Sequence, residues 1–185
     1  MIYIIDHNDS FTQNVVHQFS LYDEVVCNNY NAIDENKLKK ASVIIFSPGP
    51  GNPKNYPSTS KIYRKFKGKK KMIGICLGFQ QILFCEGAKI TEQKKIYHGF
   101  QSNIQVINNK SLFQKGKKFK VGRYHSLKLK EPFKKKNFEI TMRCLESKVA
   151  MSFENNIDKI YGFQFHPESF LTENGNLLIK KILSA

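Results

Sequence analysis

The sequence predicts an α/β fold with a mostly parallel sheet. The first half alternates short, uninterrupted apolar runs with segments of helical pattern, as expected when crossover helices bury strands on both faces. The second half holds short strand-like runs between polar turns, which indicates a small antiparallel addition rather than a further domain. A chain of 185 residues is the size of one domain, so we expect residues 1–185 to form a single domain.

Apolar runs and capping residues mark the elements of the first half. We expect strands at residues 2–5, 25–27, 43–46 and 72–75. Ser10 is a predicted N-cap for a helix that ends near residue 21, and Asp34 for a helix that ends at residue 40. Further helices are predicted over residues 58–66 and 77–86, and Gly87 is a suitable C-cap for the latter.

The second half is predicted to be strand-rich until its last segment. We expect strands at residues 104–107, 127–129, 138–142, 150–153 and 160–165, and a closing helix over residues 176–183. No apolar run approaches the roughly 20 residues of a membrane span, and the first residues carry no basic leader. We therefore expect neither a membrane partner nor a signal peptide.

The formal net charge of +15 raises the question of a nucleic-acid partner. Only three of the 30 basic residues are arginines, the side chain best suited to base readout and bidentate phosphate contacts. The lysine runs at residues 69–71, 117–118 and 134–136 lie in separate segments. The pattern favours a solvated lysine surface, and an acidic substrate or acidic partner fits the charge as well. We expect no nucleic-acid partner.

Few, scattered cysteines indicate a reducing, cytoplasmic location. The chain has four, Cys27, Cys76, Cys85 and Cys144, with no Cys-x-x-Cys pair and no histidine at a zinc-site spacing. We therefore expect no metal site. Cys27, Cys85 and Cys144 are predicted to be core residues or to have no role.

The most informative stretch is residues 74–78, which read G-I-C-L-G. A nucleophile flanked by glycines, between a strand and a helix, is typical of a nucleophile elbow, here with Cys in place of Ser. The helix N-terminus favours the thiolate form of Cys76. Cys76 is the candidate nucleophile.

A base for this thiol is found in residues 161–169, which read Y-G-F-Q-F-H-P-E-S. His166 and Glu168 project to the same side if the chain stays extended, as Pro167 favours. The imidazole would take the thiol proton, and the carboxylate would hold the imidazole tautomer. The alternative is a strand-end histidine beside a surface glutamate, but the cysteine elbow favours a triad.

Acyl transfer at Cys76 also needs an oxyanion hole. One donor is the backbone N–H of Leu77, directly after the nucleophile. The loop at residues 47–51 reads S-P-G-P-G and follows a predicted strand. Since proline has no N–H, Gly49 and Gly51 are its available donors. The alternative is a rigid turn without a ligand, although open α/β sheets bind ligands at this end of their strands.

These motifs resemble those of the class I, triad-type glutamine amidotransferases. The resemblance is carried by G-I-C-L-G-F-Q at residues 74–80 and G-F-Q-F-H-P-E-S at residues 162–169. D-H-N-D-S-F-T at residues 6–12, H-G at residues 98–99 and R-Y-H-S-L at residues 123–127 resemble the glutaminase subunits of anthranilate synthase and aminodeoxychorismate synthase. The match runs from residue 6 to about residue 175.

The resemblance implies a flavodoxin-like mixed sheet with helices on both faces. It implies that Cys76 attacks the glutamine side-chain amide, that His166 protonates the departing ammonia, and that Glu168 orients His166. The oxyanion donors would be Gly51 and Leu77, without any cofactor. The glutamine site would comprise Gly49, Pro50, Gly51, Leu77, Gln80, Ser126 and Leu127. Ammonia would pass to a separate chorismate-using synthase subunit.

Two residues depart from the family pattern, Phe79 where His is usual and Phe100 where Lys is usual. The Phe79 replacement argues against a local hydrogen bond at that position but not against the triad. Structural or partner-facing roles are predicted for His98, Arg123 and His125, and no role for His7 or His17.

Three functional alternatives stay open. The product is anthranilate or 4-amino-4-deoxychorismate, and the glycines of the 47–51 loop slightly favour anthranilate. The second alternative is a glutaminase that supplies ammonia to an acceptor other than chorismate, as in GMP synthesis. A catalytically silent basic binding module is the third possibility, against which Cys76, His166 and Glu168 argue.

Overall fold

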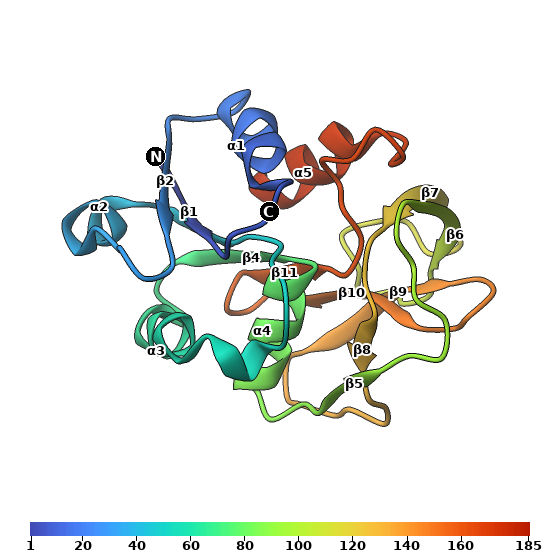
Figure 1. Cartoon of the computed structure of the whole chain (residues 1–185). Helices are drawn as coiled ribbons and strands as arrows, with labels where there is room; N and C mark the ends of the chain where they lie inside the picture. Colours follow the sequence, from blue (N-terminus) through green and yellow to red (C-terminus); the bar gives the residue numbers. More distant parts are fainter.

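A nine-stranded sheet runs through the computed structural model, which describes residues 1–185 (Figure 1). Its strands are β1 (Ile2–Asp6), β2 (Val25–Asn29), β3 (Val43–Phe46), β4 (Lys71–Ile75), β6 (Phe100–Val106), β7 (Lys118–Arg123), β9 (Glu139–Cys144), β10 (Ala150–Asn155) and β11 (Ile160–Phe163). They lie in the order β2-β1-β3-β4-β11-β10-β9-β6-β7. A separate two-stranded sheet pairs β5 (Ile90–Glu92) with β8 (Leu127–Leu129).

Five helices cover the sheet on both faces. They are α1 (Thr12–Ser20), α2 (Glu35–Lys40), α3 (Pro57–Phe66), α4 (Leu77–Cys85) and α5 (Gly175–Leu183), with a 3₁₀ turn η1 (Pro53–Asn55) before α3. Helices α1 and α5 pack on one face, and α2, α3 and α4 on the other (Figure 1). The predicted α/β class with helices on both faces is confirmed.

The parallel part of the sheet sets where a site can lie. Strands β2, β1, β3, β4 and β11 are parallel neighbours. Their carboxyl ends therefore meet at one edge of the sheet, the edge where open α/β sheets bind ligands. The loops after β1, β3, β4 and β11 begin there, and they contain the candidate site residues predicted from the first half and the His166 segment.

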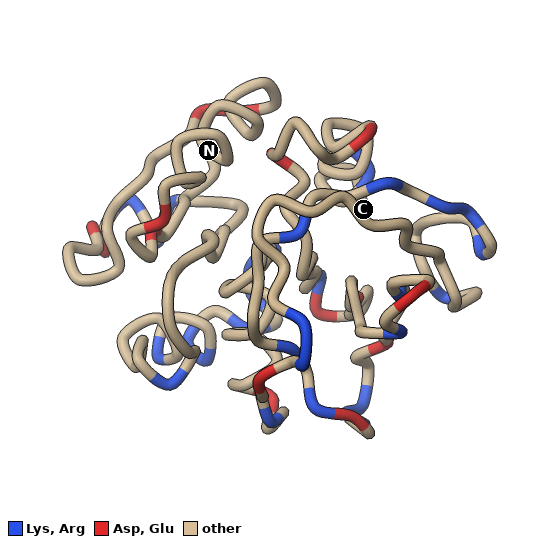
Figure 2. Tube along the Cα trace, turned by 45° about the vertical axis from the view of Figure 1, so that its right-hand side comes forward, with Lys and Arg blue, Asp and Glu red and all other residues tan.

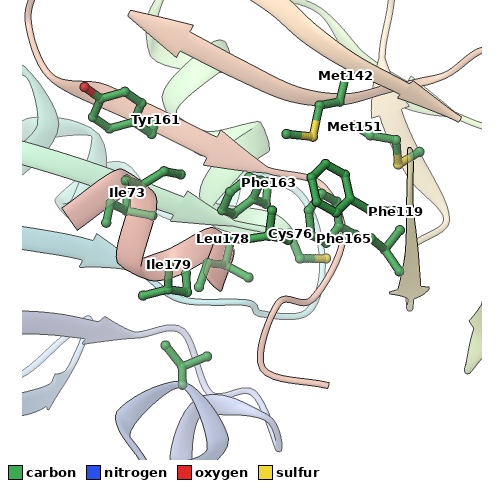
Figure 3. Packing of buried hydrophobic residues seen from close by; sticks show 14 of the residues in the cluster. Ile73, Cys76, Phe119, Met142, Met151, Tyr161, Phe163, Phe165, Leu178 and Ile179 are labelled. Carbon is green, nitrogen blue, oxygen red and sulfur yellow. The ribbon is translucent and has the colours of Figure 1, made fainter. Parts of the chain in front are cut away.

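Alternation along the strands divides the apolar residues between two cores. In β1, Ile2 and Ile4 belong to the core under α1 and α5, whereas Tyr3 and Ile5 belong to the core under α2, α3 and α4. This follows from the period of two in a strand. Figure 3 shows the first core around Cys76, where Phe163 and Phe165 lie beside it. The nucleophile is thus held against a packed interior.

The second half continues the same sheet with antiparallel strands. Strand β10 pairs antiparallel with β11 and with β9, and β6 pairs antiparallel with β9 and β7. Two strands were not among the predicted ones, β5 and β7. In β7 the sequence K-F-K-V-G-R alternates exposed lysines with buried residues at its start, so it has no continuous apolar run. The strand lies at the edge of the sheet, where one side faces solvent.

Several predicted boundaries are confirmed and others are wrong, and the strand predicted at residues 104–107 already begins at Phe100. The Asp34 side chain accepts from the backbone N–H groups of Asn36 and Lys37, as an N-cap does. Ser10 is not the cap of α1, because the helix begins at Thr12 and its N-cap Phe11 makes no side-chain cap bond. Asp9 Oδ1 instead accepts from the Phe11 N–H at 2.8 Å. The last strand ends at Phe163 rather than at residue 165.

Basic residues are spread around the molecule. Figure 2 shows the blue lysine and arginine segments apart from one another along the trace. The lysine runs at residues 69–71, 117–118 and 134–136 lie in three different surface hollows. This distribution is that of a solvated surface rather than one continuous basic stripe. None of the helices is long and apolar enough to cross a bilayer.

Candidate active site

Cys76 lies in the sharp turn between β4 and α4, at the N-cap position of the helix. Its backbone has φ 52° and ψ −101°, which is unfavourable for a residue with a side chain. The Cys76 N–H donates to the Phe163 carbonyl at 2.8 Å and thereby ties the turn to β11. The thiol thus lies at the carboxyl edge of the parallel strands and at the positive end of α4.

The two glycines of the elbow are required by close backbone approaches. A Cβ on Gly74 would lie 2.4 Å from the Gly78 carbonyl oxygen. A Cβ on Gly78 would lie 2.0 Å from the Phe46 carbonyl oxygen in β3. Both distances are far below van der Waals contact, so α4 can only start this close to the sheet without those side chains.

His166 and Glu168 form a buried pair. His166 Nδ1 lies 2.6 Å from Glu168 Oε1, and the side chains are 2% and 0% exposed. Neither His166 Nε2 nor Glu168 Oε2 makes a hydrogen bond of normal geometry. The pair matches the predicted base and orienter: the carboxylate is bound to one ring nitrogen, and the other is free to exchange a proton.

A turn, not an extended strand, brings these two residues together. His166 makes a single bridge to Gly122 in β7, where its N–H donates to the Gly122 carbonyl at 3.0 Å. The chain then turns at Pro167, and the Ser169 N–H donates back to the His166 carbonyl at 3.2 Å. The predicted pairing of His166 with Glu168 is therefore observed, but the extended conformation assumed for it is wrong.

The charges around His166 favour its protonated form. Burial alone would lower the pKa of His166, but the Glu168 carboxylate and then the Cys76 thiolate outweigh burial and raise it well above 6.5. The imidazole is therefore near enough to Cys76 for the thiolate to raise its pKa, although no hydrogen bond of normal geometry joins the two side chains. A proton can thus move from Cys76 to His166 in a site that stabilises the resulting ion pair.

A small cavity of about 160 Å³ opens beside the thiol. All seven predicted glutamine-site residues line it together with Cys76, and they come from two separate segments, residues 49–51 and 126–127, and from the start of α4. The volume is below the usual 300–1,000 Å³ of drug-sized sites, which favours a small substrate. Tyr124 and His125 also line the cavity and were not predicted to do so. His166 lies behind this lining, with its ring covered by Phe11 and Tyr124 at centroid distances of 5.1 and 5.0 Å.

Backbone donors face this cavity without partners in the protein. The N–H groups of Gly51 and Leu77 donate to no protein group, and both residues line the cavity. Gly51 has φ 77°, which glycine adopts without strain. Free N–H groups next to a nucleophile are what an oxyanion hole requires.

The structure adds residues that the sequence did not indicate. His7, for which no role was predicted, is buried against the 47–51 loop and donates its N–H to Ser47 Oγ at 2.9 Å. Burial lowers the pKa of His7 to about 4, so its ring is neutral near pH 7. Gln164 Nε2 lies 3.9 Å from Cys76 Sγ, where it can donate to a thiolate. No residue-spacing rule marks such contacts, since their partners lie far away in the sequence.

The departures from the family pattern lie outside the cavity lining. Phe79 is fully buried and packs on Phe153 with ring centroids 5.3 Å apart. Phe100 is 49% exposed, and Lys95 Nζ lies 5.3 Å from its ring centroid.

Larger hollows elsewhere lack the required chemistry. One of about 600 Å³ lies between β7 and α5, and one of about 580 Å³ lies near the lysines at residues 69–71. No cysteine or histidine lines either hollow. The small cavity at Cys76 is therefore the candidate active site, because it joins the candidate nucleophile to backbone N–H groups without partners.

Comparison with known proteins identifies relatives along the whole chain. The family model described as glutamine amidotransferase class-I matches residues 3–185. Anthranilate synthase component 2 of Lactococcus lactis subsp. lactis (strain IL1403) is 37% identical over 186 residues, covering 100% of this chain and 94% of that protein. Anthranilate synthase component 2 of Buchnera aphidicola subsp. Schizaphis graminum (strain Sg) is 37% identical over 190 residues, covering 99% and 94%.

A solved structure supports the fold. The crystal structure of a Thermoplasma acidophilum protein, provisionally named as part of a GMP synthase, superposes with a TM-score of 0.84 and covers 99% of this chain and 92% of that chain. The sequence identity is 20%, so this likeness concerns the fold alone.

Proposed function

The chain belongs to the class I glutamine amidotransferase family, and from this premise we propose that it is the glutaminase subunit of an anthranilate synthase. The observation that carries the proposal is the meeting of Cys76 with the buried His166–Glu168 pair at a cavity that has free backbone donors. The relatives named anthranilate synthase component 2 support the choice of pathway.

Cys76 is the nucleophile in the proposed mechanism. Its thiol proton passes to His166, and the thiolate attacks the side-chain amide carbon of glutamine. The N–H groups of Gly51 and Leu77 stabilise the negative oxygen of the tetrahedral intermediate. His166 then protonates the departing nitrogen, and ammonia leaves behind a glutamyl thioester. Water, deprotonated by His166, hydrolyses the thioester to glutamate and restores the thiol.

The ammonia is proposed to pass directly to a synthase subunit that uses chorismate. Free ammonia is mostly ammonium near neutral pH and then is not a nucleophile, so a shielded passage between the subunits is needed. One exposed side chain at the site fits a contact of this kind: Phe170 is 90% exposed and lies two residues after Glu168. Four free cysteines are consistent with a reducing cytosol as the location.

Reconstitution tests the function and the product together. The chain is mixed with a chorismate-using synthase subunit from the anthranilate or the aminodeoxychorismate pathway, and glutamine and chorismate are supplied. Anthranilate formation with the first subunit is expected. Formation only of 4-amino-4-deoxychorismate with the second would move the protein to the folate pathway.

The nucleophile is tested in the same complex. Cys76→Ser is expected to lower glutamine-dependent product formation by at least about 10³-fold, since triad members act as a unit. Product formation from added ammonia does not need the glutaminase reaction, so it should be unchanged. Glutamine-dependent activity retained in Cys76→Ser would exclude Cys76 as the nucleophile, whereas a wild-type complex without glutamine-dependent activity would favour a non-catalytic binding module.

A further inference from the structure

We infer that Arg123 and His125 act together as positioning residues for glutamine recognition, by fixing the Leu127 carbonyl and with it the chain at Ser126 and Leu127, which lines the cavity at Cys76. The inference rests on the proposed function, because it concerns how the same cavity holds its substrate. Sequence reasoning left both residues with an unspecified structural or partner-facing role.

The Leu127 carbonyl is held from two sides. His125 Nδ1 lies 2.8 Å from this oxygen, and Gln80 Nε2 donates to it at 3.2 Å. Both lone pairs of the Leu127 oxygen are therefore used. The Leu127–Lys128 peptide cannot rotate to direct this carbonyl elsewhere without losing both hydrogen bonds. The preceding Ser126 N–H donates to no protein group and is available to a ligand in the cavity.

The hydrogen-bond pattern allows only one tautomer of His125. Arg123 Nε donates to His125 Nε2 at 3.1 Å, and a guanidinium can only donate. Nε2 is therefore the acceptor, and the ring proton lies on Nδ1, where it donates to Leu127. Gln93 Nε2 lies near Nδ1 as well, but it donates to the His125 carbonyl at 2.5 Å.

The arrangement is insensitive to pH near neutrality. Burial, and then the Arg123 charge, lower the pKa of His125 to about 3. The ring is surrounded by Arg123, Gln93 and the stacked ring of Tyr97, and His166 adds a further positive charge nearby. None of these neighbours carries a negative charge that would stabilise a protonated His125.

Arg123 is costly as a purely structural residue. It is fully buried, it forms no salt bridge, and its Nη2 has no hydrogen-bond partner. Its guanidinium carbon lies 3.4 Å from the Tyr97 ring centroid, a contact that an apolar side chain would also make. An apolar side chain could supply neither the two 3.5 Å hydrogen bonds from Nη1 to Ser102 Oγ and Cys144 Sγ nor the shorter 3.1 Å one from Nε, which sets the His125 tautomer.

The same carbonyl connects the recognition loop to the nucleophile. Gln80 Nε2, which donates to Leu127, also donates to Gln164 Oε1 at 3.0 Å. Gln164 Nε2 in turn lies 3.9 Å from Cys76 Sγ. Displacement of the Leu127 carbonyl would thus alter the distance between the bound amino acid and the attacking sulfur.

Two electrophiles separate recognition from reactivity. Iodoacetamide alkylates the Cys76 thiol without needing the amino-acid part of a substrate, whereas a chloroketone analogue of glutamine carries the α-amino and α-carboxylate groups. His125→Gln keeps an acceptor near Arg123 but loses the donor to Leu127. It is expected to slow chloroketone labelling by about tenfold or more, as loss of a buried hydrogen bond predicts, and to leave iodoacetamide labelling unchanged.

His125→Asn is the matched control variant. Its side-chain amide stands where Nδ1–H stood, so it is expected to retain chloroketone labelling within about threefold. In the reconstituted complex, His125→Gln should raise the KM for glutamine more than it lowers kcat. Equal labelling of wild type and both variants, or equal loss with both electrophiles in both variants, would overturn the inference.

Arg123→Lys tests the hydrogen bond from Arg123 to His125, in case the His125→Gln variant does not fold. It removes the Nε–H but keeps the positive charge, and it should slow chloroketone labelling selectively. Unchanged labelling in Arg123→Lys would overturn the role of Arg123. A wild-type chain that the chloroketone does not label at Cys76 would instead contradict the proposed function.

Discussion

At the scale of single residues, Cys76 combines a strained backbone with a position at the start of α4. A residue other than glycine at φ 52° costs on the order of 1–3 kcal/mol. The close packing at Gly74 and Gly78 and the hydrogen bond to Phe163 hold it in that conformation. The strain directs the thiol toward the cavity and places it at the start of α4.

The Glu168 carboxylate should determine the tautomer of His166. In Glu168→Gln, the side-chain amide would donate to Nδ1 and move the ring proton to Nε2, which could then not accept a proton from Cys76. We expect glutamine-dependent turnover to fall by about 10²–10⁴-fold, measured in the reconstituted complex. Loss of the carboxylate should also lower the pKa of His166. Turnover within twofold of wild type would show that Glu168 does not orient the base.

His7 should make stability depend on pH. Its pKa is about 4 in the fold and about 6.5 when exposed, so the unfolded chain binds more protons between these values. The free energy of unfolding should therefore fall as the pH drops from 6.5 to 4, by up to about 3 kcal/mol from this residue. The pKa of His125 is also lowered by burial, so this residue likewise makes the free energy of unfolding fall as the pH drops.

Urea unfolding across this pH range measures the effect. His7→Asn should show a flatter dependence than wild type, and the exposed His17→Asn should leave it unchanged. Parallel pH curves for wild type and His7→Asn would mean that His7 is not buried in its neutral form.

At the scale of elements, the apolar pattern predicted strands where both faces are buried. Strands β1, β3 and β4 are continuous apolar runs, so their positions could be read directly. The position of strand β7 could not be read in this way. In its first half only one side is buried, and lysines occupy the other side. The predicted cap at Ser10 was wrong, because the helix begins at Thr12 and the Phe11 N–H before it donates to the Asp9 carboxylate, a contact that the folded loop decides.

The contact of α4 with β3 predicts a steric effect at Gly78. Gly78→Ala would place a methyl group 2.0 Å from the Phe46 carbonyl oxygen, so α4 must shift. We expect a loss of at least about 1–3 kcal/mol in the free energy of unfolding, and slower chloroketone labelling of Cys76. Gly87→Ala is the comparison: nothing lies within 4 Å of its added Cβ, so only backbone strain at φ 92° contributes. A cost at Gly78 no larger than that at Gly87 would contradict the steric explanation.

At the scale of the whole molecule, exposed apolar side chains have different positions relative to the site. Phe170 is 90% exposed and follows Ser169, whose hydroxyl lies 3.1 Å from that of Tyr124 beside His166. Ile157 is 74% exposed but precedes β11, at the opposite edge of the parallel strands. A partner that receives ammonia should cover Phe170 and leave Ile157 exposed.

This difference predicts a selective loss of partner binding. Phe170→Ser should weaken binding of the synthase subunit by about tenfold or more, as for a central interface aromatic, when measured by titration calorimetry. Ile157→Ser should bind like wild type. Equal effects of the two substitutions, or none, would place the interface elsewhere.

The candidate site illustrates what could be predicted from sequence. Cys76, His166 and Glu168 were found because a short motif surrounds each of them. Tyr124, Gln164 and His7 were not, because their importance depends on a neighbour that is distant in the sequence.

The sequence by itself indicated most of the elements, the candidate nucleophile and base, and the loop proposed to supply backbone donors. These depend on residues near one another in the chain, where propensity, capping and glycine spacing act directly. Only the tertiary structure decided that His166 reaches Glu168 through a turn anchored on Gly122, and that Arg123 sets the tautomer of His125. Such contacts arise from strand pairing and burial between distant segments, and local sequence does not encode which partners those will be.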